Sequence, residues 1–355
     1  MKKTLVALAV TAFAASASAV TLYEKDGTEV KFDGSVRLLL SKSSETEGRK
    51  TTDKHSTLKN DGSRVGVSVN QKLDNGLYAL ARAELRLNNA ANDAHGFGGV
   101  KAHRAYVGLG KKELGQVTFG NQVTAADGVG QASFANAFGV DSSALTTSGA
   151  SVLRYEYKGV EGLKLGASYS FAADRTKNEV TVGKVQNGYA LGGSYEFDGF
   201  TVAAGYSRDN FKTGQFKEKE DGVEKAYVTG KKYYKEGFQV GLAKEIDKLT
   251  LAFNTGTQVV VGKNGNSKET LVFLTPSVKL AVTDKVSVYA DYDYSRKTEK
   301  GSLDKTKTHG VAVGSSYKLH KNVFTFVEGS LSREKTGQQD KKIARNIGAG
   351  VRVSW

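Results

Sequence analysis

Side-chain character alternates with a period of two residues along this chain, and this alternation constrains the fold more than any other feature. Between Leu77 and Leu87 every second residue is small or apolar, and the residues between them include two arginines and a glutamate. A helix would mix the two sets on every face, whereas a β-strand separates them onto opposite faces. The same pattern recurs over residues 65–72, 163–171, 189–206, 286–294, 311–319 and 347–355. It predicts an all-β fold of many amphipathic strands.

The connections between these strands alternate in length. Short turns are predicted at 74–76, 110–115, 159–162, 198–199, 247–248, 283–284 and 320–322. Longer, mostly polar connections are predicted at 43–60, 88–97, 122–150, 173–187, 209–237, 262–268, 296–306 and 334–341. This alternation implies about 16 antiparallel strands, with short turns at one rim, long loops at the other and both chain ends on the short-turn side. That layout is typical of a transmembrane β-barrel.

The composition agrees with one large barrel. A length of 355 residues would suggest about two soluble domains, but no linker or boundary divides the chain. Mean hydropathy is negative, as expected when only every second strand residue faces lipid and the lumen is polar. The absence of cysteine excludes a disulfide scaffold and makes thiolate zinc sites remote.

The first 19 residues resemble a cleavable export signal. Lys2 and Lys3 precede an apolar run, which ends at a small-x-small cleavage site, Ala17-Ser18-Ala19. The alternative is a membrane anchor, but the run is shorter than the ~20 apolar residues that a spanning helix needs. We therefore expect residues 1–19 to be a signal peptide and residues 20–355 to form the barrel.

The formal net charge of +14 is compatible with a nucleic-acid partner, an anionic membrane surface or a positive lumen. The basic residues are scattered through loops and alternating positions and form no single basic helix or stripe. This distribution argues against nucleic-acid binding.

The chain ends on an aromatic residue, Trp355, at the end of an apolar stripe in the last strand. A terminal aromatic residue would fray into water in a soluble protein. In a membrane barrel it would lie in the aromatic girdle at the membrane interface.

Several segments, in this order and spacing, resemble the general porins of Gram-negative bacteria, most closely the major porins of the Pasteurellaceae. They begin at Val20-Thr-Leu-Tyr, Gly34-Ser-Val-Arg, Asp61-Gly-Ser-Arg, Asn75-Gly-Leu-Tyr, Ala105-Tyr-Val-Gly, Gly115-Gln-Val-Thr, Tyr317-Lys-Leu-His and Gly348-Ala-Gly-Val. The resemblance implies a homotrimeric barrel of the outer membrane that passes ions and small hydrophilic solutes and needs no cofactor. It also implies contacts with outer-membrane lipid and lipopolysaccharide, and insertion by the barrel-assembly machinery, guided by the strand that ends in Trp355.

The third long connection, residues 122–150, contains no lysine or arginine, although the chain has 51 of them. It carries Asp127 and Asp141 together with Phe134 and Phe138. A loop folded into the lumen, apolar against the wall and acidic toward the pore, would have this composition. The alternative is an exposed neutral loop. The resemblance likewise implies a third loop that narrows the pore.

Arginines are expected on the lumen face of the strands opposite this loop. Alternation predicts this orientation for Arg37, Arg64, Arg82, Arg86, Arg104 and Arg154. By resemblance, Arg64 occupies the position of a pore arginine and Glu84 that of a pore carboxylate. Guanidinium groups keep their charge when partly desolvated, so such a wall would filter solutes by charge and dipole. A weak preference for anions is therefore expected. Asn121 stands where some family members carry a further arginine.

Enzymatic function is not expected. The five histidines are dispersed, and neither a phosphate-binding loop nor a Gly-x-Ser-x-Gly motif is present. A barrel hydrolase would need a catalytic set at its rim, and none is evident. The main alternative to a channel is an outer-membrane adhesin or receptor that binds host ligands through its loops, above all the lysine-rich stretch 209–237.

Overall fold

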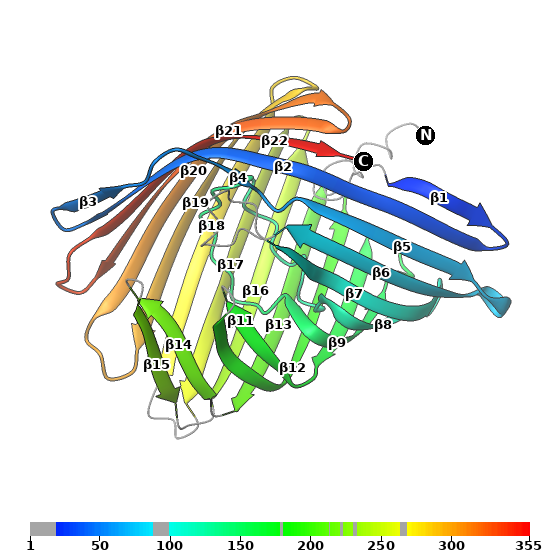
Figure 1. Cartoon of the computed structure of the whole chain (residues 1–355), viewed down its shortest axis with the longest axis horizontal. Coiled ribbons are helices and arrows are strands. Elements are labelled where there is room, and N and C mark those ends of the chain that lie inside the picture. Colours follow the sequence, from blue (N-terminus) through cyan, green and yellow to red (C-terminus); the bar gives the residue numbers. More distant parts are fainter. Residues whose placement is uncertain are drawn as a thin grey trace.

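The computed structural model describes residues 19–87, 99–177, 180–212, 214–220, 223–229, 233–262 and 268–355. The predicted signal peptide lies outside these residues, except for Ala19. Consecutive strands pair in an antiparallel sense, and the last strand of the series pairs with the first, so the sheet closes into a barrel (Figure 1). Among the described residues, no helix is long and apolar enough to cross a membrane.

Sixteen strands form the barrel wall, which confirms the predicted fold class and strand number. They are β2 (Thr28–Glu47), β5 (Arg64–Lys72), β6 (Leu77–Leu87), β7 (Val100–Lys111), β8 (Gly115–Val123), β9 (Ser148–Tyr157), β10 (Leu163–Ser170), β12 (Val180–Phe197), β13 (Phe200–Lys212), β16 (Tyr233–Ile246), β17 (Leu249–Gly262), β18 (Lys268–Ala281), β19 (Val286–Glu299), β20 (Lys305–His320), β21 (Val323–Thr336) and β22 (Lys342–Ser354). Shorter strands extend this wall. They are β1 (Val20–Lys25), β3 (Lys50–Asp53), β4 (Thr57–Asn60) and β11 (Ala173–Lys177).

Several stretches that were predicted to be loops form strands that extend beyond the wall. The stretch 43–60 contains the end of β2 together with β3 and β4, and the stretch 173–187 contains β11 and the start of β12. The stretch 209–237 holds a separate two-stranded sheet of β14 (Gly214–Glu220) and β15 (Val223–Thr229). Polar strands outside a membrane satisfy their backbone groups by pairing, as other strands do. Neither of their faces is apolar, so no alternation marks them in the sequence. These long connections lie at the left in Figure 1, and the short turns lie at the right.

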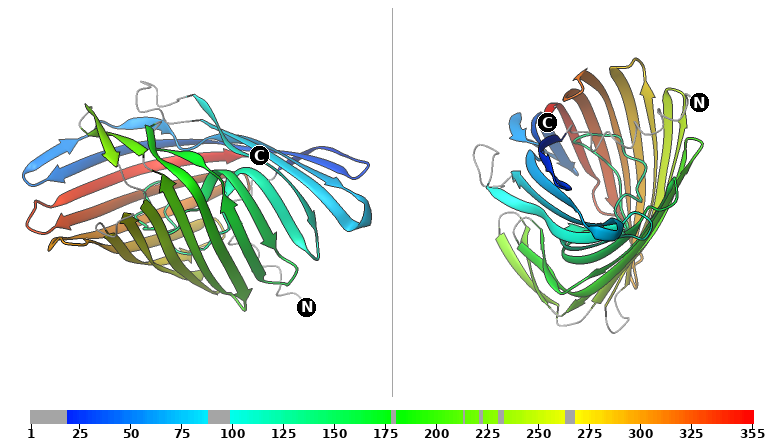
Figure 2. Two further views of the ribbon diagram at one scale, coloured as in Figure 1. Left: turned by 90° about the horizontal axis from the view of Figure 1, so that it is seen from below. Right: turned by 90° about the vertical axis from the view of Figure 1, so that its right-hand side faces the viewer.

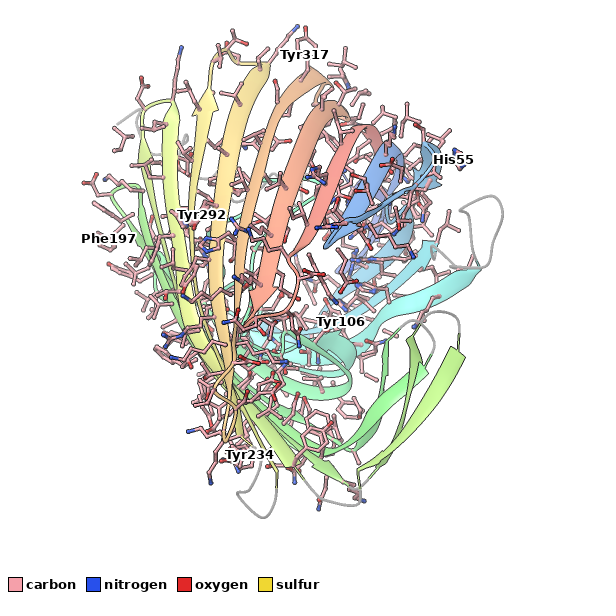
Figure 3. All side chains as sticks on the ribbon, turned by 90° about the vertical axis from the view of Figure 1, so that its left-hand side faces the viewer. His55, Tyr106, Phe197, Tyr234, Tyr292 and Tyr317 are labelled. Carbon is pink, nitrogen blue, oxygen red and sulfur yellow. The ribbon has the colours of Figure 1, made fainter. Side chains whose placement is uncertain are left out.

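Outward and inward faces alternate along each strand. On β19, Val288 is exposed, whereas Tyr289, Asp291 and Asp293 are buried. Viewed from the long-loop rim, Phe197 and Tyr317 lie on the outside of the barrel and Tyr106 lies toward its interior (Figure 3). The outer face is therefore apolar and the inner face polar, as a lipid-facing barrel requires.

The two chain ends meet beside β2 and complete the barrel together. The first part of β2 pairs with β1, from Lys25 opposite Thr28 to Val20 opposite Phe32. The remainder pairs with β22, from Ser35 opposite Ser354 onward. Strand β1 was not predicted, because a strand of six residues is too short for alternation to identify it.

Trp355 packs on a glycine at this junction. Its backbone exchanges two hydrogen bonds with Gly34, each 3.1 Å long. Its indole ring lies over Gly34, where an added Cβ would come within 2.5 Å of the ring. The ring centroid is 6.1 Å from that of Phe32. The final side chain therefore has a fixed place on the outer surface, against the first barrel strand.

We expect Gly34→Val to destabilise the barrel by about 1–3 kcal/mol, because the new side chain displaces the indole ring. The temperature at which the folded band is lost in heat-modified electrophoresis measures this effect. Val36→Leu, which enlarges an exposed side chain two residues along the same face, is the matched control and should leave that temperature unchanged. Equal behaviour of the two variants would show that the contact with Trp355 contributes nothing.

Candidate functional site

The connection between β8 and β9 folds into the barrel (Figure 2). Its backbone amides donate hydrogen bonds to side chains from the inner face of the wall. Gln131 donates to Asn254 at 2.7 Å, Ser133 to Ser277 at 3.0 Å, and Thr146 to Ser207 at 2.9 Å. A loop inside a polar lumen must satisfy its backbone in this way, since it has no strand partner.

Buried carboxylates hold the middle of this loop. Glu328 of β21 accepts hydrogen bonds from the consecutive amides of Asn136, Ala137 and Phe138, at 2.8, 2.5 and 2.7 Å. The hydroxyl of Tyr289 also donates to Glu328, at 2.7 Å. Charge-assisted bonds of this kind are stronger than neutral ones. They fix both the height of the loop and its distance from the wall.

Asp291 and Asp293 of β19 extend this set of anchors. Asp291 accepts the amides of Phe134 and Ala135, at 2.9 and 2.8 Å. Asp293 accepts the amide of Ser142 at 3.0 Å. Both carboxylates are nearly inaccessible to solvent. These three carboxylates of the wall, Glu328, Asp291 and Asp293, thus bind the loop and do not face the open lumen.

Glycines let the loop backbone lie directly on the wall. A Cβ at Gly192 of β12 would come within 2.0 Å of the carbonyl oxygen of Ala125. A Cβ at Gly241 of β16 would come within 2.1 Å of that of Val129. Any other residue at either position would push the loop toward the centre of the lumen.

Apolar side chains of the loop pack against the same wall. Phe138 packs with Leu39 and Phe326 in one cluster. Ala126, Val129 and Leu145 pack with Ala190 and Ala203 in another. The loop therefore has an apolar side toward the wall, as its composition suggested.

The two loop aspartates are both exposed. Asp127 lies within electrostatic range of Arg104 and Arg154. Asp141 accepts a hydrogen bond from the Ser133 hydroxyl at 2.8 Å. Asp127 therefore lies close to wall cations, and Asp141 lies farther along the loop.

Arginines gather on the inner face of β2, β5, β6 and β22. Arg64 lies within electrostatic range of Arg37, Arg86 and Arg352. Arg352 donates a hydrogen bond to the carbonyl oxygen of Asn136 in the loop at 2.8 Å, and pairs with Asp61 at 3.0 Å. We call Arg37, Arg64, Arg86 and Arg352 the arginine wall.

Glu84 is the carboxylate beneath these cations. It lies 2.6 Å from Arg86, 3.1 Å from Arg82 and 3.9 Å from Arg64, and is only 6 % exposed. Arg82 also donates two hydrogen bonds to the carboxylate of Asp33 in a bidentate pair, at 2.8 and 2.9 Å. The charge of Arg82 is thus balanced by two close carboxylates, whereas Arg64 makes only the longer contact of 3.9 Å with Glu84.

The remaining predicted arginines differ in their surroundings. Arg104 of β7 lies within electrostatic range of Arg86, Glu84 and Asp127. Arg154 of β9 pairs with Glu156 on its own strand, and so does Lys158. Arg104 therefore adjoins the arginine wall, and Arg154 belongs to a separate ion-paired group.

Arg352 and Asp61 were not predicted from the sequence. The outward stripe of the last strand ends at Trp355, so the alternate residues Gly348, Gly350 and Arg352 face inward, and this alternation is the signal that identifies Arg352 as a lumen residue. Across the described residues, no group of three or more His, Asp or Glu side chains is arranged to hold a metal ion.

Comparison with known proteins assigns the family. A model of the Gram-negative porin family matches residues 4–337. The chain is 33% identical to the major outer membrane protein of Pasteurella multocida strain Pm70, over 100% of both chains.

Solved structures show the same fold. The trimer form of OmpT, an outer membrane protein of Vibrio cholerae, is 19% identical over 93% of this chain and 100% of its own, with a TM-score of 0.73. OmpF of Salmonella typhi in complex with daunomycin is 16% identical over 95% of this chain and 100% of its own, with a TM-score of 0.68. With the family match and the full-length relative, these likenesses show that the chain belongs to the Gram-negative porins, passive channels of the outer membrane.

Proposed function

We propose that the segment 122–150 is the constriction loop of this channel, and that it forms a narrow passage with the arginine wall. The observation that carries this proposal is the series of loop amides bound to lumen side chains of β13, β17, β18, β19 and β21. A loop held at many points keeps a fixed cross-section, which a size filter for small hydrophilic solutes requires.

The charge around the passage supports a weak preference for anions. Six arginines (37, 64, 82, 86, 104 and 352) cluster with three carboxylates, those of Asp33, Asp61 and Glu84. The excess of positive charge raises the local concentration of anions. On this proposal Asp127 and Asp141 line the acidic side of the passage.

We further propose that the channel is a homotrimer, since one of the solved structures of its fold is described as a trimer form. Export through a signal peptide at 1–19 and insertion by the barrel-assembly machinery through the strand ending in Trp355 belong to the same proposal. The Gram-negative porin family points to a channel and not to an enzyme.

Single-channel recording in a planar bilayer under a salt gradient tests the proposal. Insertion of the refolded protein should give conductance steps in groups of three. Its reversal potential should have the sign of an anion-preferring pore. A folded, heat-modifiable barrel that gives no steps would contradict the channel, and a reversal potential of the opposite sign would contradict the role of the arginine wall.

A further inference from the structure

One row of side chains on the inner face of β20, β21, β22 and β2 combines cations with an aromatic ring. Phe324 lies between Lys318 and Arg352 in the strand ladder. Arg352 also lies opposite Arg37 on its other side. All four side chains are partly exposed, on the face of the sheet that points into the lumen. We call Lys318, Phe324, Arg352 and Arg37 the mixed row.

The mixed row lies on the short-turn side of the loop anchors. Phe324 precedes Glu328 by four residues along β21, which places it about 13 Å nearer the short-turn rim. Arg352 connects the row to the loop, because it donates a hydrogen bond to the carbonyl oxygen of Asn136 at 2.8 Å. On the proposed path through the lumen, a solute that has passed the loop therefore meets this row.

Phe324 is more accessible than the aromatic side chains near it. Phe326 and Tyr289 also face inward, but they are 3 % and 5 % exposed, because residues of the loop contact them. Phe324 packs beside the same apolar cluster and remains half-buried. Part of its ring is thus in contact with water in a polar lumen. An aromatic solute that stacks on the ring would remove this apolar area from water.

Arg352 has a fixed position beside the ring. Its guanidinium carbon is 5.9 Å from the centre of the Phe324 ring and 5.1 Å from that of the Phe326 ring. Its terminal nitrogens donate to Asp61 at 3.0 Å and to Asn136. Arg352 therefore adds positive potential next to the ring but has few donors left for a solute.

Arg37 has the donors that Arg352 lacks. Its Nε donates to the Ser35 hydroxyl at 2.8 Å, and within the described part of the chain its terminal nitrogens have no hydrogen-bond or ion-pair partner. A guanidinium with open N–H groups binds a carboxylate through two parallel hydrogen bonds. Two strand spacings, about 10 Å, separate the backbones of Arg37 and Phe324. Since an arginine side chain covers part of this span, a carboxylate a few carbon atoms from an aromatic ring would contact both residues.

We propose that the mixed row binds small aromatic carboxylates, with the ring of the solute on Phe324 and its carboxylate at Arg37. Lys318 and Arg352 raise the local concentration of anions on either side of the ring. An inorganic anion makes only the contact with Arg37, and a neutral sugar has no carboxylate for it. This inference rests on the proposed function, because it names a class of solute that the passage favours.

The test measures how hydrocinnamate reduces the chloride current of single refolded channels in a planar bilayer. Phe324→Leu keeps an apolar side chain but removes the ring, and it should raise the half-saturating concentration of hydrocinnamate about three- to tenfold. Phe324→Tyr restores the ring and should return this concentration to the unmodified value.

The matched control is Tyr106→Leu. Tyr106 also lies toward the interior of the barrel (Figure 3), but its ladder partner Arg82 already has its charge balanced by Asp33 and Glu84. This variant should leave the half-saturating concentration unchanged. The proposal is overturned if Phe324→Leu has no effect, or if Tyr106→Leu has an equal one.

Two further solutes test the chemical class. Hexanoate has the same charge without a ring, so it should bind more weakly and respond little to Phe324→Leu. Phenylpropylammonium has the ring with the opposite charge, and it should give no saturable reduction of the current. If hexanoate depends on Phe324 as strongly as hydrocinnamate does, the row accepts any apolar anion and the assignment to aromatic carboxylates fails.

Binding of hydrocinnamate to the refolded barrel in neutral detergent, measured by ligand NMR, separates this inference from the proposed function. Anion-preferring channels whose affinity for hydrocinnamate does not respond to Phe324→Leu would overturn the site and leave the proposed function standing. Barrels that give no conductance but bind hydrocinnamate through Phe324 would support the site and contradict the proposed function alone. If Phe324→Leu does not refold, Arg37→Gln takes its place and should weaken binding at least about tenfold. Unchanged binding by that variant would equally overturn the proposal.

Discussion

Glu328→Gln should release the middle of the loop from the wall and give a channel with larger, unsteady conductance. The carboxylate accepts three consecutive loop amides and the hydroxyl of Tyr289. An amide side chain has one acceptor oxygen and places an NH₂ group against the remaining donors. Loss of two bonds of about 1.5–3 kcal/mol each shifts the bound-to-released ratio of the loop by about 10²–10⁴. Single-channel recordings should show frequent transitions to a wider state.

The matched control is Glu334→Gln on the same strand. Its side chain is exposed near the long-loop rim, and among the residues that the structure describes no loop amide donates to it. It should conduct as the unmodified channel does, with the same noise. Identical records for the two variants would mean that Glu328 does not position the loop.

Alternation in the sequence was sufficient to predict the barrel, because burial on one face is a local property of each strand. Residues such as Val311 and Val327 face lipid regardless of their partners. The strand count followed, since short turns and long connections alternate. Strands outside the membrane, such as β3 and β11, carry no such pattern and were assigned to loops.

The loop anchors could not be predicted in this way. Glu328 and the amide of Phe138 are 190 positions apart in the chain, and nothing local distinguishes that glutamate from an acid facing open water. Only the register between strands and the path of the loop bring them together. The small exposure of Asp291 and Glu328, 1 % and 2 %, is therefore a property of the assembled barrel.

Alternation also cannot predict which charged side chains form ion pairs. Alternation assigns a face to each arginine but does not say which of them are neutralised. In the structure Arg82 is held by Asp33 and Glu84, and Arg154 is held by Glu156. These pairs join neighbours across strands or along one strand, and their strength depends on side-chain geometry. The arginines that carry the field in the lumen are those with the weakest pairing, chiefly Arg37 and also Arg64, whose contact with Glu84 is a long one of 3.9 Å.

Arg37→Gln/Arg64→Gln should therefore reduce or abolish the preference for anions. A unit charge about 6 Å from a permeating ion contributes about 0.7 kcal/mol in water, and screening with a Debye length of about 10 Å at 0.1 M salt reduces this. Loss of two charges should lower the anion-to-cation permeability ratio about two- to fivefold, measured from reversal potentials in a salt gradient. The control Lys31→Gln/Lys164→Gln removes two cations that are paired with Glu29 and Glu196. If the control lowers the ratio equally, the selectivity depends on total lumen charge and not on the arginine wall.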